Sequence, residues 1–121
     1  MAKNIELGSA GERLAHDFLV NQGYKILEKN WRSGKAEVDL IAEINKTIIF
    51  VEVKTRRNNF FSQPEAAVNA HKQQLLAKAA GDYLAQNNRE GEIRFDVISI
   101  ILEGTESEIT HFEDAFFPYD S

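Results

Sequence analysis

The spacing of apolar residues near the start of the chain predicts a helix over residues 9–21. Its apolar side chains recur at helical intervals and form one stripe, made of Ala10, Leu14, Ala15, Phe18 and Leu19. Ser9 and Glu12 match the S-x-x-E capping box, which places the start of the helix at Ser9. Gly23, just behind the last turn, is typical of a helix C-terminus. Glu12 lies at the edge of the stripe, so its carboxylate either caps the helix or faces a site.

Alternation with a period of two predicts the strands. They are expected at residues 24–31, 36–44, 47–55, 92–102 and 109–112, the last being a short edge strand. A turn is expected at residues 32–35, and a second helix starts at Ser62 or at Asn69 and ends near Asn87. Helix, three strands, helix and strand in this order predict a small α/β or α+β domain around one sheet.

The two middle strands form a hairpin whose register follows from its short loop. A two-residue loop at residues 45–46, or a four-residue loop around them, pairs residues whose numbers sum to 91. Asp39 then lies opposite Glu52. Glu37 lies opposite Lys54, and all four side chains project from one face. The other face is expected to be the core face and collects Val38, Leu40, Ala42, Ile49, Val51 and Val53.

Two carboxylates that face each other across strands repel unless a cation lies between them. The oxygen ligands of Asp39 and Glu52 suit Mg²⁺ or Mn²⁺, which keep water molecules that a phosphate can displace. Lys54 is two residues beyond Glu52 on the same face, where its ammonium can stabilise the charge that develops on a phosphate during hydrolysis. The alternative is a solvated sheet face on which Glu37 and Lys54 form an ordinary ion pair.

Three basic residues outside this face of the hairpin also favour a phosphate-binding site in this region. Lys72 falls in the middle of the apolar stripe of the second helix, so its ammonium needs an anionic partner, unless the side chain extends to solvent. Arg56 and Arg57 directly follow the predicted site and are suited to grip phosphates. Phe60 and Phe61 come next, and they either stack on bases at a nucleic-acid lip or pack back onto the domain.

Composition narrows the classes of protein. The 121 residues suffice for a single domain, and a hydrophobic content of 43% is ordinary for a globular protein. The absence of cysteine excludes disulfides, thiolate metal sites and a cysteine nucleophile. The three histidines, His16, His71 and His111, lack the spacing of a zinc site. No apolar run is long enough for a membrane span or a signal segment, so we expect a cytoplasmic protein with no membrane partner.

The net charge of −5 is spread unevenly along the chain. Residues 1–78 hold 12 Lys and Arg residues against 9 Asp and Glu, whereas residues 79–121 hold 2 against 10. Because charges more than about 10 Å apart are screened at moderate salt, a polyanion can still bind to the basic half. The alternative is that the second half is simply an acidic, solvated surface.

Several segments together resemble the YraN-like family of bacterial proteins. They are GSAGERLAHDFLVNQGYKILEKNWR, AEVDLIA, FVEVKTR, EAAVNAHKQQLLAKAAGDYL and RFDVISI. Their collinear order covers about residues 8–118 and leaves a short polar tail. The family is related to archaeal Holliday-junction resolvases and to the PD-(D/E)XK nuclease superfamily. The resemblance implies one nuclease-like domain over residues 1–121 with a restriction-endonuclease-like core, a mixed central sheet flanked by helices.

The resemblance also implies roles for individual residues. Asp39 and Glu52 match the metal-binding acids of the motif, and the backbone carbonyl of Val53 would complete the ligands of Mg²⁺ or Mn²⁺. Lys54 matches the motif lysine. Glu12 matches the additional acid that the resolvase relatives carry on a helix.

Two functions of different classes are compatible with these observations. The first is a metal-dependent nuclease that hydrolyses DNA phosphodiester bonds, at branched or damaged structures if the kinship holds, with Arg56, Arg57 and Lys72 on the phosphate backbone. The second is a nucleic-acid-binding or protein-interaction module that keeps the fold without cutting, which the net charge of −5 favours. A third, plainer alternative is a sheet protein with paired surface charges. The resolvase relatives suggest a homodimer, but no exposed apolar stripe in the sequence requires one.

Overall fold

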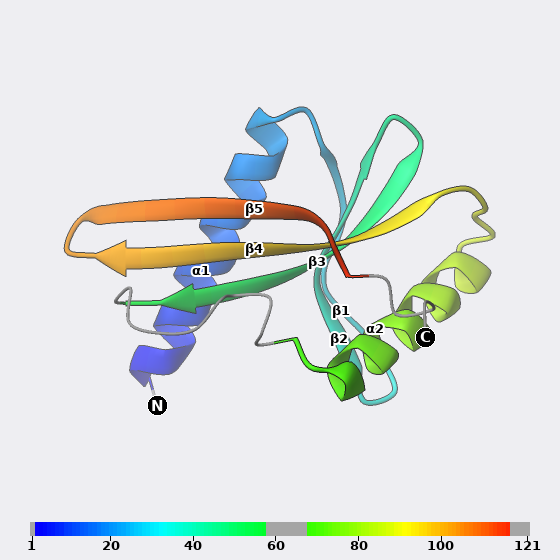
Figure 1. Cartoon of the computed structure of the whole chain (residues 1–121), viewed down its shortest axis with the longest axis horizontal. Coiled ribbons are helices and arrows are strands. Elements are labelled where there is room, and N and C mark those ends of the chain that lie inside the picture. The colour runs from blue at the N-terminus through cyan, green and yellow to red at the C-terminus, as the bar shows by residue number, and fades with distance from the viewer. Residues whose placement is uncertain (1, 58–67, 117–121) are drawn as a thin grey trace.

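The computed structural model describes residues 2–57 and 68–116, with the backbone alone for residues 2–7. Its elements are α1 (Ala2–Asn21), β1 (Lys25–Ser33), β2 (Ala36–Ile44), β3 (Thr47–Arg56), α2 (Ala70–Gln86), β4 (Ile93–Glu103) and β5 (Glu106–Phe116). Figure 1 shows the strands at the centre with a helix on either side. This confirms the expected α/β class, with a mixed sheet flanked by helices as in a restriction-endonuclease-like core.

The five strands form one sheet in the order β1-β2-β3-β4-β5. Neighbouring strands are antiparallel except β3 and β4, which are parallel. Two parallel neighbours need a long crossover connection, and here α2 lies in it. The three strands before α2 are therefore a meander, and the two strands after it form the second antiparallel pair.

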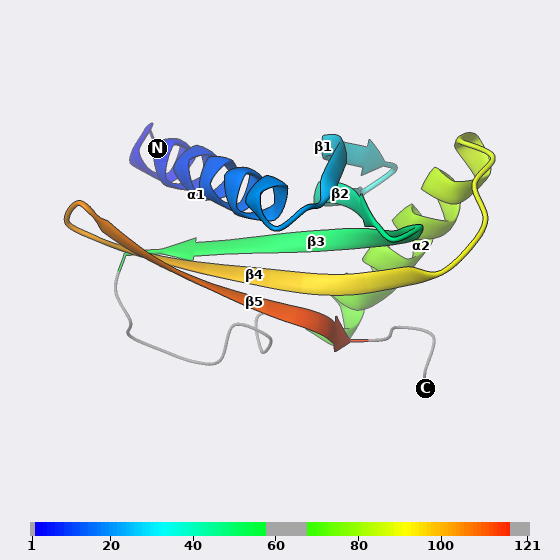
Figure 2. The ribbon, with the colours of Figure 1, turned by 90° about the horizontal axis from the view of Figure 1, so that it is seen from above.

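The two helices bury opposite faces of this sheet. One core cluster lies under α1 and includes Ala15, Leu19, Leu40, Ala42, Ile49, Val51, Ile98 and Ile100. The other lies under α2 and includes Val38, Ile41, Ile48, Phe50, Leu76, Ala79, Ala80, Tyr83, Phe95 and Val97. Neighbours such as Ile49 and Phe50 fall in different clusters, as the period of a strand requires. Figure 2 shows α1 lying along one face of the strands.

Both faces of the hairpin are buried, not only the expected core face, so the alternative of a solvated face does not hold along its whole length. Ile41, Ile48 and Phe50 lie on the face predicted to carry Asp39 and Glu52, and all three are buried because α2 covers them. Val38, expected under the other face, also packs in the α2 cluster. The continuous apolar run at residues 48–51 is thus typical of a strand buried on both faces.

The start of α1 differs from the prediction, whereas its end agrees with it. The helix begins at Ala2, so Ser9 lies inside it and the Ser9–Glu12 capping box is wrong. At the other end Gly23 has a left-handed backbone, with φ 96°. The N–H of Gly23 donates to the carbonyl of Val20, and the next N–H returns to Leu19, which closes the helix as a C-terminal glycine does.

The second helix and the last strand settle two other expectations. Asn69 caps α2 by accepting the N–H of Lys72 at 2.9 Å, which confirms the later of the two predicted starts. The alternative start at Ser62 lies outside the described residues, and the helix ends at the cap Asn87 as predicted. The last strand is much longer than residues 109–112, because β5 pairs with β4 along most of its length. Neither helix in the described part of the chain is long and apolar enough to cross a membrane.

Candidate active site

Strands β2 and β3 separate at Asp39. Their ladder pairs residues 40–44 with residues 47–51 in the predicted register and ends there. One position beyond the last pair, Asp39 Oδ2 accepts a hydrogen bond of 2.8 Å from the N–H of Val53. The side chain, rather than the backbone of β2, therefore satisfies this donor. The first half of β2 continues beside β1, so Asp39 stands where the sheet opens.

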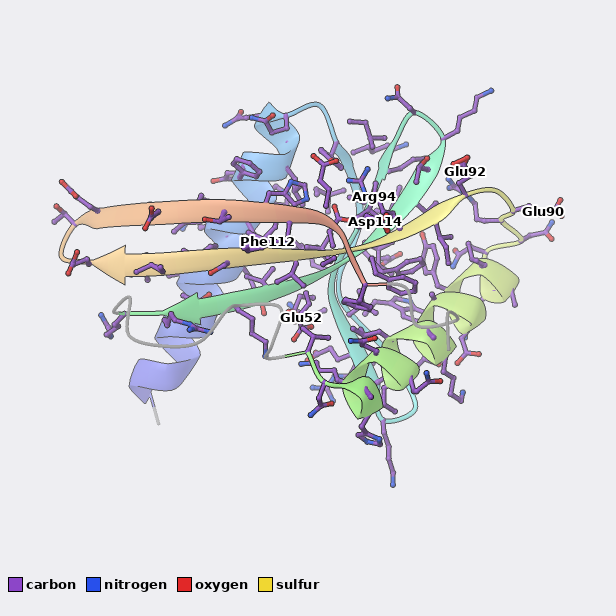
Figure 3. All side chains as sticks on the ribbon, viewed as in Figure 1. Glu52, Glu90, Glu92, Arg94, Phe112 and Asp114 are labelled. Carbon is purple, nitrogen blue, oxygen red and sulfur yellow. The ribbon has the colours of Figure 1, made fainter. Side chains whose placement is uncertain are left out.

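Glu52 is buried beside this opening, with only 4% of its surface exposed (Figure 3). Lys72, which reaches across from α2, donates a hydrogen bond to Glu52 Oε2. The ammonium of Lys54 lies 3.4 Å from the same oxygen. A buried carboxylate is tolerated when cations pair with it, and two lysines do so here. The prediction that the inward-facing Lys72 needs an anionic partner is confirmed.

The plain ion pair that was the alternative for this face is not formed. Glu37 accepts a hydrogen bond of 3.2 Å from Arg32 Nε of β1 instead of contacting Lys54. Both side chains of the Arg32–Glu37 pair are well exposed, so the pair adds little stability. Lys54 lies beside Glu52 instead.

A cavity of about 350 Å³ lies at the opening. It is lined by Lys35, Ala36, Glu37, Asp39, Glu52, Asn69, His71, Lys72, Leu75 and Leu76. Lys35 and His71 are among the lining residues that were not predicted as site residues. Their position could have been inferred, because Lys35 precedes the acid-bearing strand and His71 adjoins Lys72 in the first turn of α2.

The surroundings of Asp39 raise its pKa to about 7. Burial is the main cause and the negative charge of Glu52 is the second, while the hydrogen bond from Val53 opposes them. Burial alone would lower the pKa of Lys72, but the hydrogen bond to Glu52 and its charge outweigh burial and raise that pKa. Carboxyl groups perturbed in this way are common at functional sites.

Glu12 approaches the opening from α1. It is half-buried, as expected at the edge of the apolar stripe, and its charge also raises the pKa of Asp39. The helix comes very close to β3 at Gly11, where an added Cβ atom would lie 2.8 Å from the Cβ of Thr55. Only glycine permits this approach, and it sets α1 against the strand next to Lys54.

The two arginines of the predicted site lie farther away. Arg56 ends β3, and Arg57 follows it. At about 3.3 Å per strand residue, Arg56 is displaced from Glu52 by roughly 13 Å along the strand. Phe60 and Phe61, the predicted aromatic lip, lie outside the described residues. The structure thus gathers the acids Asp39 and Glu52 with Lys54 and Lys72, and it does not bring Arg56 and Arg57 to the same place.

The oxygen donors fit a small divalent cation. In the described part of the chain, no three acidic or histidine side chains are grouped closely enough to hold a metal by themselves. Mg²⁺ does not need such a group, since it is usually held by one or two carboxylates together with water and substrate phosphates. Asp39 and Glu52 supply two carboxylates, and a neighbouring positive charge would favour the ionised form of Asp39.

Comparison with known proteins places the chain in a family. The family model described as Uncharacterised protein family UPF0102 matches residues 11–100. The chain belongs to the UPF0102 family. This confirms the YraN-like resemblance. A UPF0102 protein of Flavobacterium psychrophilum is 45% identical over 98% of this chain and 100% of its own length. Another from Thermodesulfovibrio yellowstonii is 47% identical over 93% of this chain and 97% of its own.

Among solved structures, the chain is similar to SfsA of Pyrococcus furiosus, determined in complex with Ca²⁺. The sequences are 17% identical, the TM-score is 0.40, and 91% of this chain is covered. The chain spans only 63% of the length of that structure. A likeness of this degree decides neither the fold nor the activity.

Proposed function

We propose that this UPF0102 protein is a metal-dependent nuclease that hydrolyses phosphodiester bonds of DNA. The observation that carries the proposal is the pair of acids, Asp39 and Glu52, at the opening of the sheet beside a cavity of about 350 Å³. Burial and, next, the charge of Glu52 disfavour the ionised form of Asp39, so the arrangement is better explained by a ligand than by stability. Lys54, on the same side, supplies the positive charge that phosphate chemistry requires.

Asp39, Glu52 and the carbonyl of Val53 would hold Mg²⁺ or Mn²⁺ in this proposal. Such an ion, when bound, neutralises phosphate charge and makes a water molecule more acidic. The hydrogen bond from Val53 keeps the carboxylate of Asp39 in place. Lys54 donates to a phosphate oxygen as negative charge develops on it, because its ammonium is already held at the site by Glu52, 3.4 Å away.

The other basic and acidic side chains have supporting roles. Lys72 exchanges its hydrogen bond with Glu52 for one with a phosphate of the substrate. Glu12, close enough to influence Asp39, accepts a proton through a water molecule. Arg56 and Arg57 hold the phosphate backbone farther along the strand. Binding should therefore weaken steeply as salt is added.

Substitution of Lys54 by alanine tests the proposal. Wild-type protein with Mg²⁺ is expected to cleave at least one of a set of branched, flapped, nicked and plain duplex DNAs. The Lys54→Ala variant should cleave it at least about a hundredfold more slowly, since a group that stabilises transition-state charge is lost. Lys25→Ala removes an exposed lysine of β1 and serves as the control with unchanged activity. No cleavage of any substrate by the wild type would contradict the proposal.

A second candidate function is a nucleic-acid-binding or protein-interaction module without catalysis. It is favoured by the hydrogen bond of Lys72 to Glu52, which already neutralises one acid, and by the net charge of −5. In that case DNA would bind without being cut. Lys54→Ala would then remove one phosphate contact. The slope of the logarithm of the binding constant against the logarithm of the salt concentration would become shallower by about one.

A further inference from the structure

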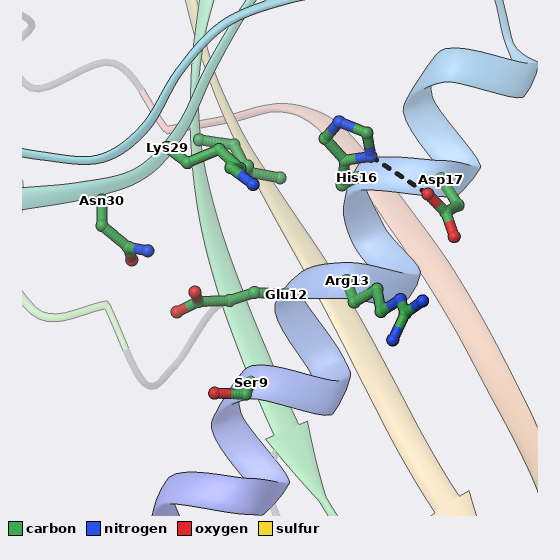
Figure 4. A pocket seen from close by; sticks show the side chains of 8 residues that line it. Ser9, Glu12, Arg13, His16, Asp17, Lys29 and Asn30 are labelled. Carbon is green, nitrogen blue, oxygen red and sulfur yellow. Dashed lines mark hydrogen bonds and ion pairs between the residues drawn. The ribbon is translucent and has the colours of Figure 1, made fainter.

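A second cavity of about 350 Å³ lies between α1 and β1. Figure 4 shows Ser9 and Glu12 directed toward it from the helix, with Lys29 and Asn30 approaching from the strand. Leu40 also lines this cavity, and the preceding residue of β2 lines the cavity of the candidate active site. Two consecutive residues of β2 therefore line the two cavities, one on the α1 side of the sheet and the other on the α2 side.

The backbone of Asn30 is unusual for its position. It has φ 50°, in the left-handed region, although it lies inside β1. The neighbouring pairs of the β1–β2 ladder, Lys29 with Leu40 and Trp31 with Val38, place Asn30 directly opposite Asp39. A non-glycine residue at positive φ within a strand is strained, and such strain is concentrated at functional positions. Here it interrupts the regular alternation of β1 beside the candidate metal ligand.

Three polar side chains of this cavity have no hydrogen-bond or ion-pair partner within the part of the chain that the structure describes. The side chains of Glu12, Lys29 and Asn30 form no hydrogen bond or ion pair with any other described residue. His16 also lines the cavity, and its Nδ1 lies 3.0 Å from Asp17 Oδ1 (Figure 4). The cavity thus combines an amide, an ammonium and an aromatic ring with the carboxylates of Glu12 and Asp17.

We propose that this cavity receives one unpaired nucleobase of the DNA strand whose phosphate lies at Asp39. The inference rests on the proposed function, which places that strand at the opening of the sheet. Asn30 offers both a donor and an acceptor, which suit the edge of a base, and Lys29 can bind a neighbouring phosphate. The ring of His16 offers a face for stacking. The volume is within the range of small-molecule sites, which begins at about 300 Å³.

The chemistry of the cavity selects an unpaired base. In a duplex the Watson–Crick edge is covered by the partner strand, and the stacked neighbours cover the faces of the base. A base can enter the cavity and meet both Asn30 and His16 only if it has left the stack. The substrate class is therefore single-stranded or locally unpaired DNA, and a continuous duplex is a poorer ligand.

Asn30→Gly is the variant that tests this inference, because glycine accepts φ 50° without strain and only the amide is lost. Asn88→Gly is the matched control, since Asn88 has φ 53° and lies beyond the end of α2, outside both cavities. Binding is measured by fluorescence anisotropy with labelled homopolymer DNA strands and a duplex, in a chelator so that no cleavage occurs. Wild type should prefer single strands and discriminate among the bases by about threefold or more.

Asn30→Gly should weaken binding of the preferred strand by about threefold to tenfold and remove the base preference, whereas Asn88→Gly should bind as wild type does. Equal binding by Asn30→Gly and wild type, or equal binding of duplex and single strands by wild type, would overturn the inference. If Lys54→Ala abolishes cleavage while Asn30→Gly changes nothing, only the base cavity fails. If wild type cuts nothing while Asn30→Gly loses the preference, the cavity stands and the nuclease proposal fails.

Discussion

At the scale of single residues, the two acids of the candidate site differ in how many positively charged side chains pair with them. Glu52 is paired with Lys54 and Lys72, whereas Asp39 receives one backbone hydrogen bond, from Val53. That bond does not offset burial and the charge of Glu52, so the pKa of Asp39 stays high. Without a further cation, ionisation of Asp39 therefore opposes folding above neutral pH.

The first prediction concerns Asp39→Asn. The folded pKa of about 7 exceeds the usual value of 3.8, so the folded state retains a proton that the unfolded state releases. The free energy of unfolding of the wild type therefore falls as pH rises between these two values. One pKa unit corresponds to about 1.4 kcal/mol. The free energy of unfolding of Asp39→Asn, relative to that of the wild type, should therefore be at least about 1 kcal/mol higher at about pH 8 than at about pH 4. Chemical denaturation in a chelator measures this difference.

Thermal unfolding with added Mg²⁺ distinguishes stabilisation by a bound cation from the effect of Asp39 protonation on stability. A cation that binds only the folded state must raise the melting temperature, and it should do so for the wild type but not for Asp39→Asn. Glu90→Gln, at an exposed carboxylate, is the control and should follow the wild type in both experiments. If Mg²⁺ left the melting temperature of the wild type unchanged, a sheet protein with paired charges and no ligand would be favoured.

The same residues show how far the sequence could predict the site. The need of Lys72 for an anionic partner followed from its place in an apolar stripe, because an inward-facing ammonium needs an anion. The strained Asn30 could not be predicted, because positive φ inside a strand depends on how β1 pairs with β2. The roles of Asp39 and Glu52 in metal binding and catalysis are predictions that the experiments above test.

At the scale of the elements, local chemistry predicted the hairpin well, but it predicted the start of α1 and the length of β5 poorly. Residues 45–46 form the expected two-residue loop, and both have positive φ, as a tight hairpin turn requires. The capping pattern at Ser9 was overridden, because the residues before it include good helix formers and α1 continues through them. The polar start of β5, from Glu106, has no apolar alternation, so its strand conformation depends on pairing with β4.

The second prediction concerns the contact between α1 and β3. Gly11→Ala adds a Cβ atom 2.8 Å from the Cβ of Thr55, so the helix must move away from the strand. Overpacking of this kind costs roughly 1–3 kcal/mol, which exceeds the gain of about 1 kcal/mol in helix propensity. Gly81→Ala is the matched control in α2, where an added Cβ atom meets nothing within 4 Å. It should stabilise the protein by about 0.5–1 kcal/mol.

Urea denaturation distinguishes the two glycine variants. The free energy of unfolding should fall for Gly11→Ala and rise for Gly81→Ala. Equal stabilisation of both would show that α1 can shift without cost, and Glu12 would then not be held in place by the close approach at Gly11.

At the scale of the whole molecule, a buried polar cluster joins segments that are distant in sequence. Asp96 of β4 is fully buried and accepts two hydrogen bonds from Arg94, at 2.9 and 2.8 Å, and one from the N–H of Asp114. His111 Nε2 of β5 lies 2.7 Å from the same carboxylate. Arg94 also donates to the hydroxyl of Tyr24, just after α1, and Figure 3 shows Arg94 and Asp114 near the crossing of β4 and β5. The links of this cluster to His111 and Tyr24 depend on the order of the strands in the sheet.

The last prediction concerns this cluster. Burial, the largest influence, would raise the pKa of Asp96, but the hydrogen bonds from Arg94, His111 and Asp114 together lower it. Its contribution to folding is therefore present above the usual carboxyl pKa of 3.8 and is lost as pH falls through the folded value. The side chain of Asp96→Asn cannot accept hydrogen bonds from all of these donors. The variant should lose roughly 3–5 kcal/mol of the free energy of unfolding near neutral pH, and its stability should depend less on acid than that of the wild type.

The control is Glu113→Gln, which alters only an exposed partner of Arg94, at 3.5 Å. It should change the free energy of unfolding by less than about 1 kcal/mol. If urea denaturation gave both variants the same stability, the cluster would not be what joins β4, β5 and the residue that follows α1.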